Sequence, residues 1–265
     1  MDPYFTSKGA NWSTLKLLDD SPLAYRHALE NPRADTADLA LGRLVHTLVF
    51  EPQKFGDEYA VFDGAIRSGK AWEAFKAANE GRTIFKTDEI ANARAIAEAV
   101  RRHPLVAPYL VGGQFETVLR WTDPATGIAC KAKADWIIPG RRILADLKTT
   151  RSIERRRFAA DVARYSYYGQ LAHYAAGVKH ALGWEPQRRI LIAVEKAAPY
   201  DVAIYELDAA ACEIGDEKQQ ELLAKLKACL DLGEWPGRYT EEQTLELPGW
   251  VFGADDLDIT FDTED

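Results

Sequence analysis

Two aspartates and a lysine in the middle of the chain are of the types, and at the spacing, that suit a hard cation. Asp146 and Lys148 lie in the apolar run 143–148, and Asp135 directly precedes another apolar run. Charges in such runs are unexpected unless they have a function. Carboxylate oxygens are ligands that Mg²⁺ prefers, and an ammonium group beside the cation can orient a water and stabilise a phosphate. Alternatively, the aspartates are edge charges on an exposed sheet face.

The spacing of these residues also predicts how a β-hairpin positions them. Segments 128–138 and 143–149 read as strands joined by a loop that contains Pro and Gly. If the strands pair from this loop outward, the two residue numbers of every cross-strand pair add up to 281. Asp135 then faces Asp146. Lys148 shares the face of Asp146, because side chains alternate with a period of two. Two opposed carboxylates repel each other, and a divalent cation between them would compensate.

The elements around the hairpin are predicted from apolar periodicity, caps and prolines. Expected helices begin at Asn11 and span 38–50, 70–79, 88–102, 161–182 and 209–232; expected strands are 115–121, 189–195 and 203–207. Helices that flank a hairpin-containing sheet predict an α/β or α+β fold in a single domain.

Composition narrows the class of protein. The net charge of −8 disfavours nucleic-acid binding at first sight, but six acids lie in the acidic tail 251–265. Three widely spaced cysteines form no CxxC pair, which argues against an iron–sulfur cluster and suits a reducing cytoplasm. No apolar run reaches the ~18 residues of a membrane span, and the N-terminus does not read as a secretory signal. The absence of a Gly-x-x-x-x-Gly-Lys-Ser/Thr loop argues against ATP.

Polar residues near the hairpin are further candidates. Arg151, Arg155 and Arg164 belong to a basic cluster that can track a DNA backbone, or it can be the solvated start of a helix. Gln170 and Tyr174 are four residues apart on one helix face. They can present an amide and a phenol to a phosphate, or simply pack.

Short motifs are spread over nearly the whole chain. They are Gly42-Arg43-Leu44-Val45-His46, Glu51-Pro52, Asp123-Pro124, Thr126-Gly127-Ile128, Asp146-Leu147-Lys148-Thr149-Thr150, Glu234-Trp235-Pro236 and Leu247-Pro248-Gly249-Trp250. Together they resemble the RecE-type exonuclease (exonuclease VIII) branch of the RecB-like PD-(D/E)xK nucleases. The C-terminal motifs have no general chemical meaning, so their match is specific to this branch. Ala134 departs from the class name, which has proline there; the proline supplies no chemistry.

The resemblance implies a metal site and a catalytic lysine. A histidine inside a helix, such as His46, is more often packed than a metal ligand, but here the resemblance implies a ligand. Asp135, Asp146 and the backbone carbonyl of Leu147 are expected to complete the set, with Lys148 as the catalytic lysine. The implied cation is Mg²⁺, and Mn²⁺ is expected to substitute for it.

Four other positions match the family in the same way. Glu116 matches an acidic position near the active site, as an outer ligand or as a partner of one. Gln170 and Tyr174 match the Gln-x-x-x-Tyr motif. Ser13 resembles a serine that meets a 5′-phosphate.

The implied fold is a restriction-endonuclease-like core with a central mixed β-sheet flanked by helices. A mainly helical N-terminal part, 1–104, would precede the nuclease core, 115–232, within one domain of residues 1–265. The implied activity is digestion of linear double-stranded DNA from 5′ to 3′, leaving 3′ single strands for recombination. A ring-shaped oligomer, expected to be a tetramer, and a RecT-like annealing partner are implied too, in a bacterial or phage-encoded setting. A PD-(D/E)xK endonuclease and an inactive DNA-end-binding module remain as alternatives.

Overall fold

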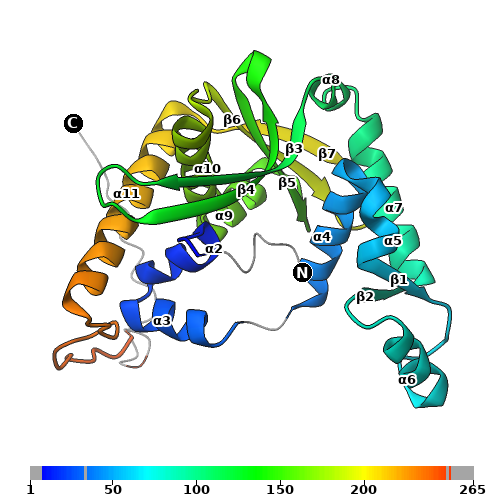
Figure 1. Cartoon of the computed structure of the whole chain (residues 1–265), viewed down its shortest axis with the longest axis horizontal. Coiled ribbons are helices and arrows are strands. Elements are labelled where there is room, and N and C mark those ends of the chain that lie inside the picture. Colours follow the sequence, from blue (N-terminus) through cyan, green and yellow to red (C-terminus); the bar gives the residue numbers. More distant parts are fainter. Residues whose placement is uncertain (1–7, 33–34, 249–250, 252–265) are drawn as a thin grey trace.

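A five-stranded mixed sheet lies at the centre of the computed structural model, which describes residues 8–32, 35–248 and 251 (Figure 1). The strand order is β3-β4-β5-β6-β7, with β5 and β6 parallel and the other neighbours antiparallel. The strands are β3 (Gln114–Thr122), β4 (Ala129–Ile138), β5 (Ile143–Thr150), β6 (Arg188–Glu195) and β7 (Val202–Glu206). The expected mixed sheet flanked by helices is therefore confirmed.

Along the sequence, helices lie before, between and after the strands of this sheet. The longer ones are α3 (Pro22–Glu30), α4 (Ala37–Phe50), α6 (Gly69–Ala78), α7 (Thr87–Arg102), α9 (Arg155–Tyr165), α10 (Tyr167–Leu182) and α11 (Ala209–Leu232). Short turns of helix are α2 (Trp12–Leu15), η1 (Lys16–Asp19), η2 (Pro52–Lys54), α5 (Phe55–Glu58), α8 (Ala107–Leu110) and η3 (Pro139–Arg141). Asn11 caps α2, because its side chain accepts a hydrogen bond from the Thr14 backbone N–H at 3.2 Å.

The sheet is covered on both faces, which gives two apolar cores. On one face α10 packs against β3, β4 and β5, and α11 packs against α10. This first core includes Leu119, Leu144 and Leu171. On the other face α4 and α7 pack against each other and against β5 and β6, and the second core includes Trp136 and Leu147. Strands buried on both faces read as continuous apolar runs, which is why 143–147 is nearly all apolar.

The prediction of one helix over 161–182 is wrong in two respects: the helix begins earlier, and it is divided into α9 and α10. The chain is already helical from Arg155, because the Glu154 carboxylate caps the backbone N–H groups of Arg156 and Arg157. The helix then breaks at Ser166, which has a left-handed φ of 55°. The Trp12 indole donates a hydrogen bond to the Ser166 carbonyl at 3.1 Å, so a distant contact supports the break.

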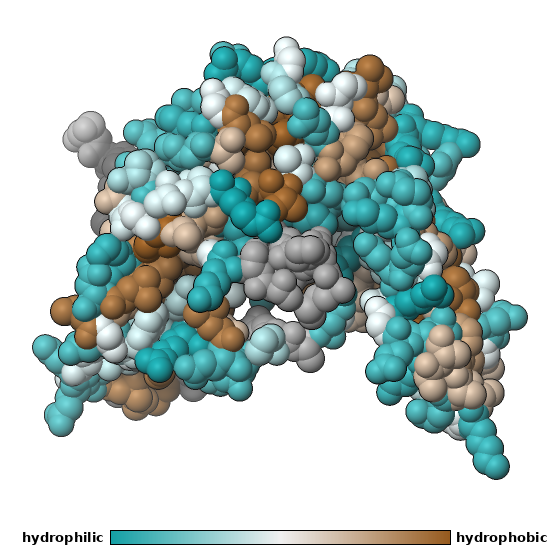
Figure 2. All heavy atoms as spheres, viewed as in Figure 1, coloured by the Kyte–Doolittle hydropathy of each residue, from teal (hydrophilic) through white to brown (hydrophobic). Residues whose placement is uncertain are grey.

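A small unit lies beside α4 and α7, and the sequence patterns predicted its helix, as 70–79, but not its two strands. It consists of the parallel pair β1 (Tyr59–Phe62) and β2 (Thr83–Lys86) with α6 between them. Phe62 contacts Trp72 and Phe75 of α6 and gives the unit its own apolar centre. The unit projects from the rest of the molecule (Figure 1). The same view shows mostly hydrophilic side chains on the surface, with smaller apolar patches (Figure 2).

Two expectations from the sequence can be compared only with the residues that the structure describes. The acidic tail 251–265 lies outside them except for Val251. Within residues 8–32, 35–248 and 251, no helix combines the length and apolar composition that a bilayer span requires.

Gly169 is a position where a side chain would disturb the packing of α10. A Cβ atom there would lie 2.2 Å from Cζ2 of Trp12, far inside van der Waals contact. We expect Gly169→Ala to lower the free energy of unfolding by about 1–3 kcal/mol, because overpacking forces α10 away from Trp12. Urea unfolding measures this change. Gly56→Ala is the control, because Gly56 is helical with open space around it. Equal stability of the two variants would contradict the prediction.

Candidate metal and nuclease site

The site lies where β4 and β5 separate. The predicted register is confirmed for three pairs, Trp136–Ala145, Ile137–Leu144 and Ile138–Ile143. The ladder ends there, so Asp135 and Asp146 do not form the direct cross-strand pair that this register predicts. Instead, Oδ2 of Asp135 accepts a hydrogen bond from the Leu147 backbone N–H at 3.0 Å. The carboxylate of one strand thus bonds to the backbone of the next.

The strands β3 and β4 are both distorted where Glu116 and Asp135 lie opposite each other. In a regular strand Ala134 and Trp136 would share a face, yet Ala134 lies in the first core and Trp136 in the second. Between them Asp135 is skipped by the pairing, as is Glu116 opposite it on β3. Glu116 has a left-handed φ of 50°, a conformation that costs about 1–3 kcal/mol in a non-glycine residue. This distortion brings the Glu116 and Asp135 carboxylates to the site.

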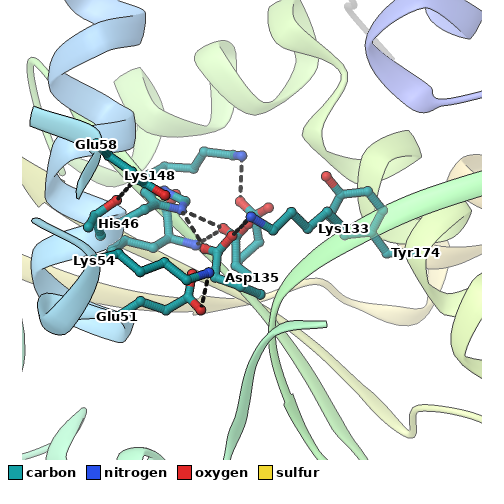
Figure 3. A network of polar contacts seen from close by, with 12 residues as sticks. His46, Glu51, Lys54, Glu58, Lys133, Asp135, Lys148 and Tyr174 are labelled. Atoms are coloured by element: carbon teal, nitrogen blue, oxygen red, sulfur yellow. Dashed lines mark hydrogen bonds and ion pairs between the residues drawn. The ribbon is translucent and has the colours of Figure 1, made fainter. Parts of the chain in front are cut away.

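His46 reaches this point from α4 (Figure 3). Its Nε2 lies 2.9 Å from the carbonyl oxygen of Leu147. Its Nδ1 lies 3.5 Å from Oδ2 of Asp135 and 3.7 Å from Oε1 of Glu116. A carbonyl only accepts, so Nε2 carries a proton, and the two carboxylates favour a second proton on Nδ1. Burial lowers the pKa of His46, but Asp135, Glu116 and Asp146 outweigh it and raise the pKa to about 9.

The two carboxylates that face His46 have pKa values shifted in opposite directions. Burial and the charge of Asp146 raise the pKa of Asp135 to about 7, against the opposing charges of His46 and Lys148. Burial also raises the pKa of Glu116, but contacts with His46 and Lys133 lower it overall. The closeness of several like charges in a buried site explains these shifts.

Asp146 and Lys148 form a second cluster with α10. Asp146 is fully buried, and its Oδ2 lies 2.5 Å from the Lys148 Nζ. Lys148 donates to Oε1 of Gln170 at 3.0 Å, and the Gln170 amide donates to Asp146 and to the Tyr174 hydroxyl at 3.1 and 2.8 Å. The Lys148 Nζ also lies 4.6 Å from the ring centre of Tyr167. One amide thereby fixes the lysine, the aspartate and the phenol relative to one another.

The first cluster, formed by His46, Glu116 and Asp135, offers the ligand atoms of a divalent cation site. Ligand atoms of His46, Glu116 and Asp135 all lie within 4.8 Å of one another. The carbonyl of Leu147 adjoins them, and Oε1 of Glu116 is buried without a hydrogen bond. Carboxylate and carbonyl oxygens suit Mg²⁺ and Mn²⁺, and the imidazole is a ligand typical of transition-metal cations. Asp146 is not in this set, because its carboxylate is turned toward Lys148 and Gln170.

The four predicted DNA contacts lie outside both clusters. The side chains of Ser13, Arg151, Arg155 and Arg164 are exposed. The Ser13 hydroxyl donates to the Asn11 side chain at 2.5 Å, and the Arg164 guanidinium lies over the Tyr165 ring at 5.6 Å. Their exposure is compatible with DNA contact, and that role stays a prediction.

Sequence reasoning missed Lys133. Its Nζ lies 2.9 Å from Oε2 of Glu116, so it belongs to the site. Its position two residues before Asp135 was an available signal, because strand residues two apart share a face. Also missed was the polar contact of Thr47, the neighbour of His46, with Glu58 and Tyr59, each at 3.2 Å.

Cation binding should release protons, because His46 ligates a metal only as neutral imidazole. His46 has a pKa of about 9, so one proton must leave at pH 7, and Asp135 with a pKa of about 7 adds part of another. The apparent Mn²⁺ affinity should therefore rise by about tenfold or more between pH 7 and pH 8. Calorimetric titration in two buffers of different ionisation enthalpy measures both effects. His46→Gln should flatten the dependence above the pKa of Asp135. A binding heat that is the same in both buffers would contradict the prediction.

A solved structure of another protein shares the fold of this chain. The crystal structure of a "putative exonuclease" from Eubacterium rectale matches with a TM-score of 0.63 and 16% identity, covering 96% of this chain and 98% of that one. A phage related exonuclease from Haemophilus somnus 129PT matches with a TM-score of 0.38 and 11% identity, covering 86% and 97%. At such low identity, the first match shows a shared fold. No curated protein matches the chain.

A family model covers most of the chain, including both clusters. The family is described as a PDDEXK-like domain of unknown function (DUF3799), and its model matches residues 11–246. The matched range includes the fork of β4 and β5, His46 on α4, and Gln170 and Tyr174 on α10. The chain therefore belongs to this family of PDDEXK-like domains.

Proposed function

We propose that the chain is a Mg²⁺-dependent exonuclease of the PD-(D/E)xK type that hydrolyses linear double-stranded DNA. One observation carries the proposal. Carboxylates of β3, β4 and β5, the imidazole of α4 and a lysine of β5 converge in one buried network, although they span residues 46 to 148. Perturbed, mutually dependent ionisable groups of this kind are typical of catalytic sites.

Each group has a task in phosphodiester hydrolysis. His46, Glu116, Asp135 and the Leu147 carbonyl would hold the cation, with Asp146 beside them. The cation, when bound, supplies Lewis acidity and positive charge at the scissile phosphate. Lys148 holds its ammonium group toward the reacting phosphate, where it orients the attacking water and offsets developing negative charge.

The surroundings of Lys148 keep that ammonium group charged and in place. Burial lowers the pKa of Lys148, but Asp146 and Asp135 outweigh it and raise the pKa. Gln170 accepts from Lys148 and donates to Asp146, so the lysine has one preferred position. Tyr174, bonded to the same amide, would present its hydroxyl beside it. Preorganised donors of this kind need no rearrangement when charge develops.

The finer points of the proposal rest on the resemblance to RecE-type exonucleases. We propose digestion from the 5′ end with a 3′ single strand as the product, by a ring-shaped homotetramer in the cytoplasm of a bacterium or of a phage-infected cell. The annealing partner would be RecT-like. Mn²⁺ would substitute for Mg²⁺. Ser13, Arg151, Arg155 and Arg164 would contact the DNA backbone, for which exposed cationic side chains are suited.

Replacement of Asp146 tests the chemistry. Asp146→Asn should abolish cleavage of linear duplex DNA with Mg²⁺, because a neutral amide cannot supply the negative charge that the Asp146 carboxylate holds 2.5 Å from the Lys148 ammonium group. Lys148→Met should lower the rate by about 10²–10⁴-fold. Asp57→Asn, on the exposed α5, is the matched control and should keep wild-type rates. Thermal unfolding and binding of duplex DNA verify that both site variants still fold.

The choice of DNA substrate separates the proposal from its alternatives. Linear duplexes labelled at either 5′ or 3′ ends report polarity, and closed circular duplex reports internal cleavage. Loss of the 5′ label first, with intact circles, agrees with the proposal. Cleaved circles would instead support an endonuclease. Binding of linear duplex without any cleavage would support an end-binding module.

A further inference from the structure

We propose that Lys133 is a second lysine that contacts the substrate, binding a backbone phosphate of the DNA at the Glu116 side of the site. This inference rests on the proposed nuclease function. It assigns to Lys133 a phosphate contact distinct from the task of Lys148.

The position of Lys133 is the first observation. The acids of the site follow one another along neighbouring strands, with Glu116 on β3, Asp135 on β4 and Asp146 on β5. Lys148 pairs with the last of these acids and Lys133 with the first, at 2.5 and 2.9 Å. In Figure 3, Lys133 extends from its strand toward the centre of the network. A phosphate held between the clusters would have one ammonium group on each side.

Accessibility is the second observation. The Lys133 side chain is 23% exposed and the Lys148 side chain 16% exposed, whereas Asp146 is 0% exposed. Both ammonium groups are thus partly accessible to solvent, whereas the Asp146 carboxylate is not. Because a lysine ammonium group is a compact point charge on a flexible stem, it can shift from a carboxylate to a nearby phosphate oxygen.

The chemistry of Glu116 gives the third observation. Its Oε2 pairs with Lys133, while Oε1 faces Nδ1 of His46 at 3.7 Å. A cation bound by His46, Glu116 and Asp135 competes with Lys133 for the Glu116 carboxylate. A backbone phosphate of the DNA is an anion that the ammonium group can bind when the cation holds the Glu116 carboxylate.

A structural role is the competing explanation, in which Lys133 only holds Glu116 in place. The two roles differ in their dependence on salt. A phosphate contact releases counterions from DNA, so its loss lowers the slope of log binding constant against log salt by about 0.9. A lysine that only supports Glu116 would leave this slope unchanged and would weaken cation binding instead.

The test compares Lys133→Met with Lys133→Arg and with the control Lys227→Met, which removes an ion-paired lysine of α11. Fluorescence anisotropy measures binding of a linear duplex with Ca²⁺ at several salt concentrations, and initial rates with Mg²⁺ give KM and kcat. We expect Lys133→Met to lower the salt slope by about 1 and to raise KM by about tenfold. Lys133→Arg should restore the slope, and Lys227→Met should match wild type. Thermal unfolding checks that the variants fold.

The outcomes separate this inference from the proposed function. A wild-type slope in Lys133→Met, or weakened Mn²⁺ binding as its only defect, overturns the inference while leaving the nuclease function in place. Wild-type protein that binds duplex DNA without cleaving it overturns the nuclease function, and the salt slopes still decide the role of Lys133. Wild-type protein that neither cleaves nor binds duplex DNA overturns both.

Discussion

A half-buried imidazole joins the helical layer to the fork in the sheet. His46 donates from Nε2 to the Leu147 carbonyl of β5, and its Nδ1 faces carboxylates of β3 and β4. Since the ladder between β4 and β5 stops before Asp135, this residue is held instead by the Leu147 N–H and His46. Removing one partner from a buried set of charges is costly, at about 3–5 kcal/mol, because the remaining charge is left uncompensated. The geometry of the fork thus depends on an imidazole from a helix about a hundred residues away in the sequence.

Charge compensation explains why so many ionisable groups can share a buried site. Three acids, Glu116, Asp135 and Asp146, are balanced by His46, Lys133 and Lys148. The balance is strained, because Asp135 has a pKa of about 7 and His46 a pKa of about 9. Such values mean that Asp135 tends to keep a proton and that His46 gains one. A divalent cation held by His46, Glu116 and Asp135 would relieve both tendencies, because it would supply positive charge there in place of the imidazole proton.

The residue patterns were sufficient for the period-two pairing, and the family resemblance for the mixed sheet, but neither was sufficient where the strands depart from regularity. Counting outward from the loop placed Asp135 opposite Asp146, and the register is correct as far as the ladder extends. The distortion at Glu116 is invisible to that count, because nothing in Phe115-Glu116-Thr117 signals a left-handed residue. The break at Ser166 was missed for a similar reason. Neither glycine nor proline marks it, and its contact with the Trp12 indole lies 154 residues away in the sequence. Local patterns predict elements, whereas these features are set by tertiary contacts.

The helical N-terminal part acts on both clusters of the site, directly on one and through α10 on the other. His46 enters the cation cluster itself. Trp12 packs against Gly169 and bonds the Ser166 carbonyl, which fixes the start of α10. Gln170 follows Gly169 directly, so the amide that orders Lys148 and Asp146 is positioned by a residue of α2. The strands supply the charged groups, but helices at the start of the chain set how those groups face one another. The sheet alone would therefore place the acids near one another without their histidine or an ordered lysine, which is why the N-terminal helices and the strands have to be considered as one functional unit.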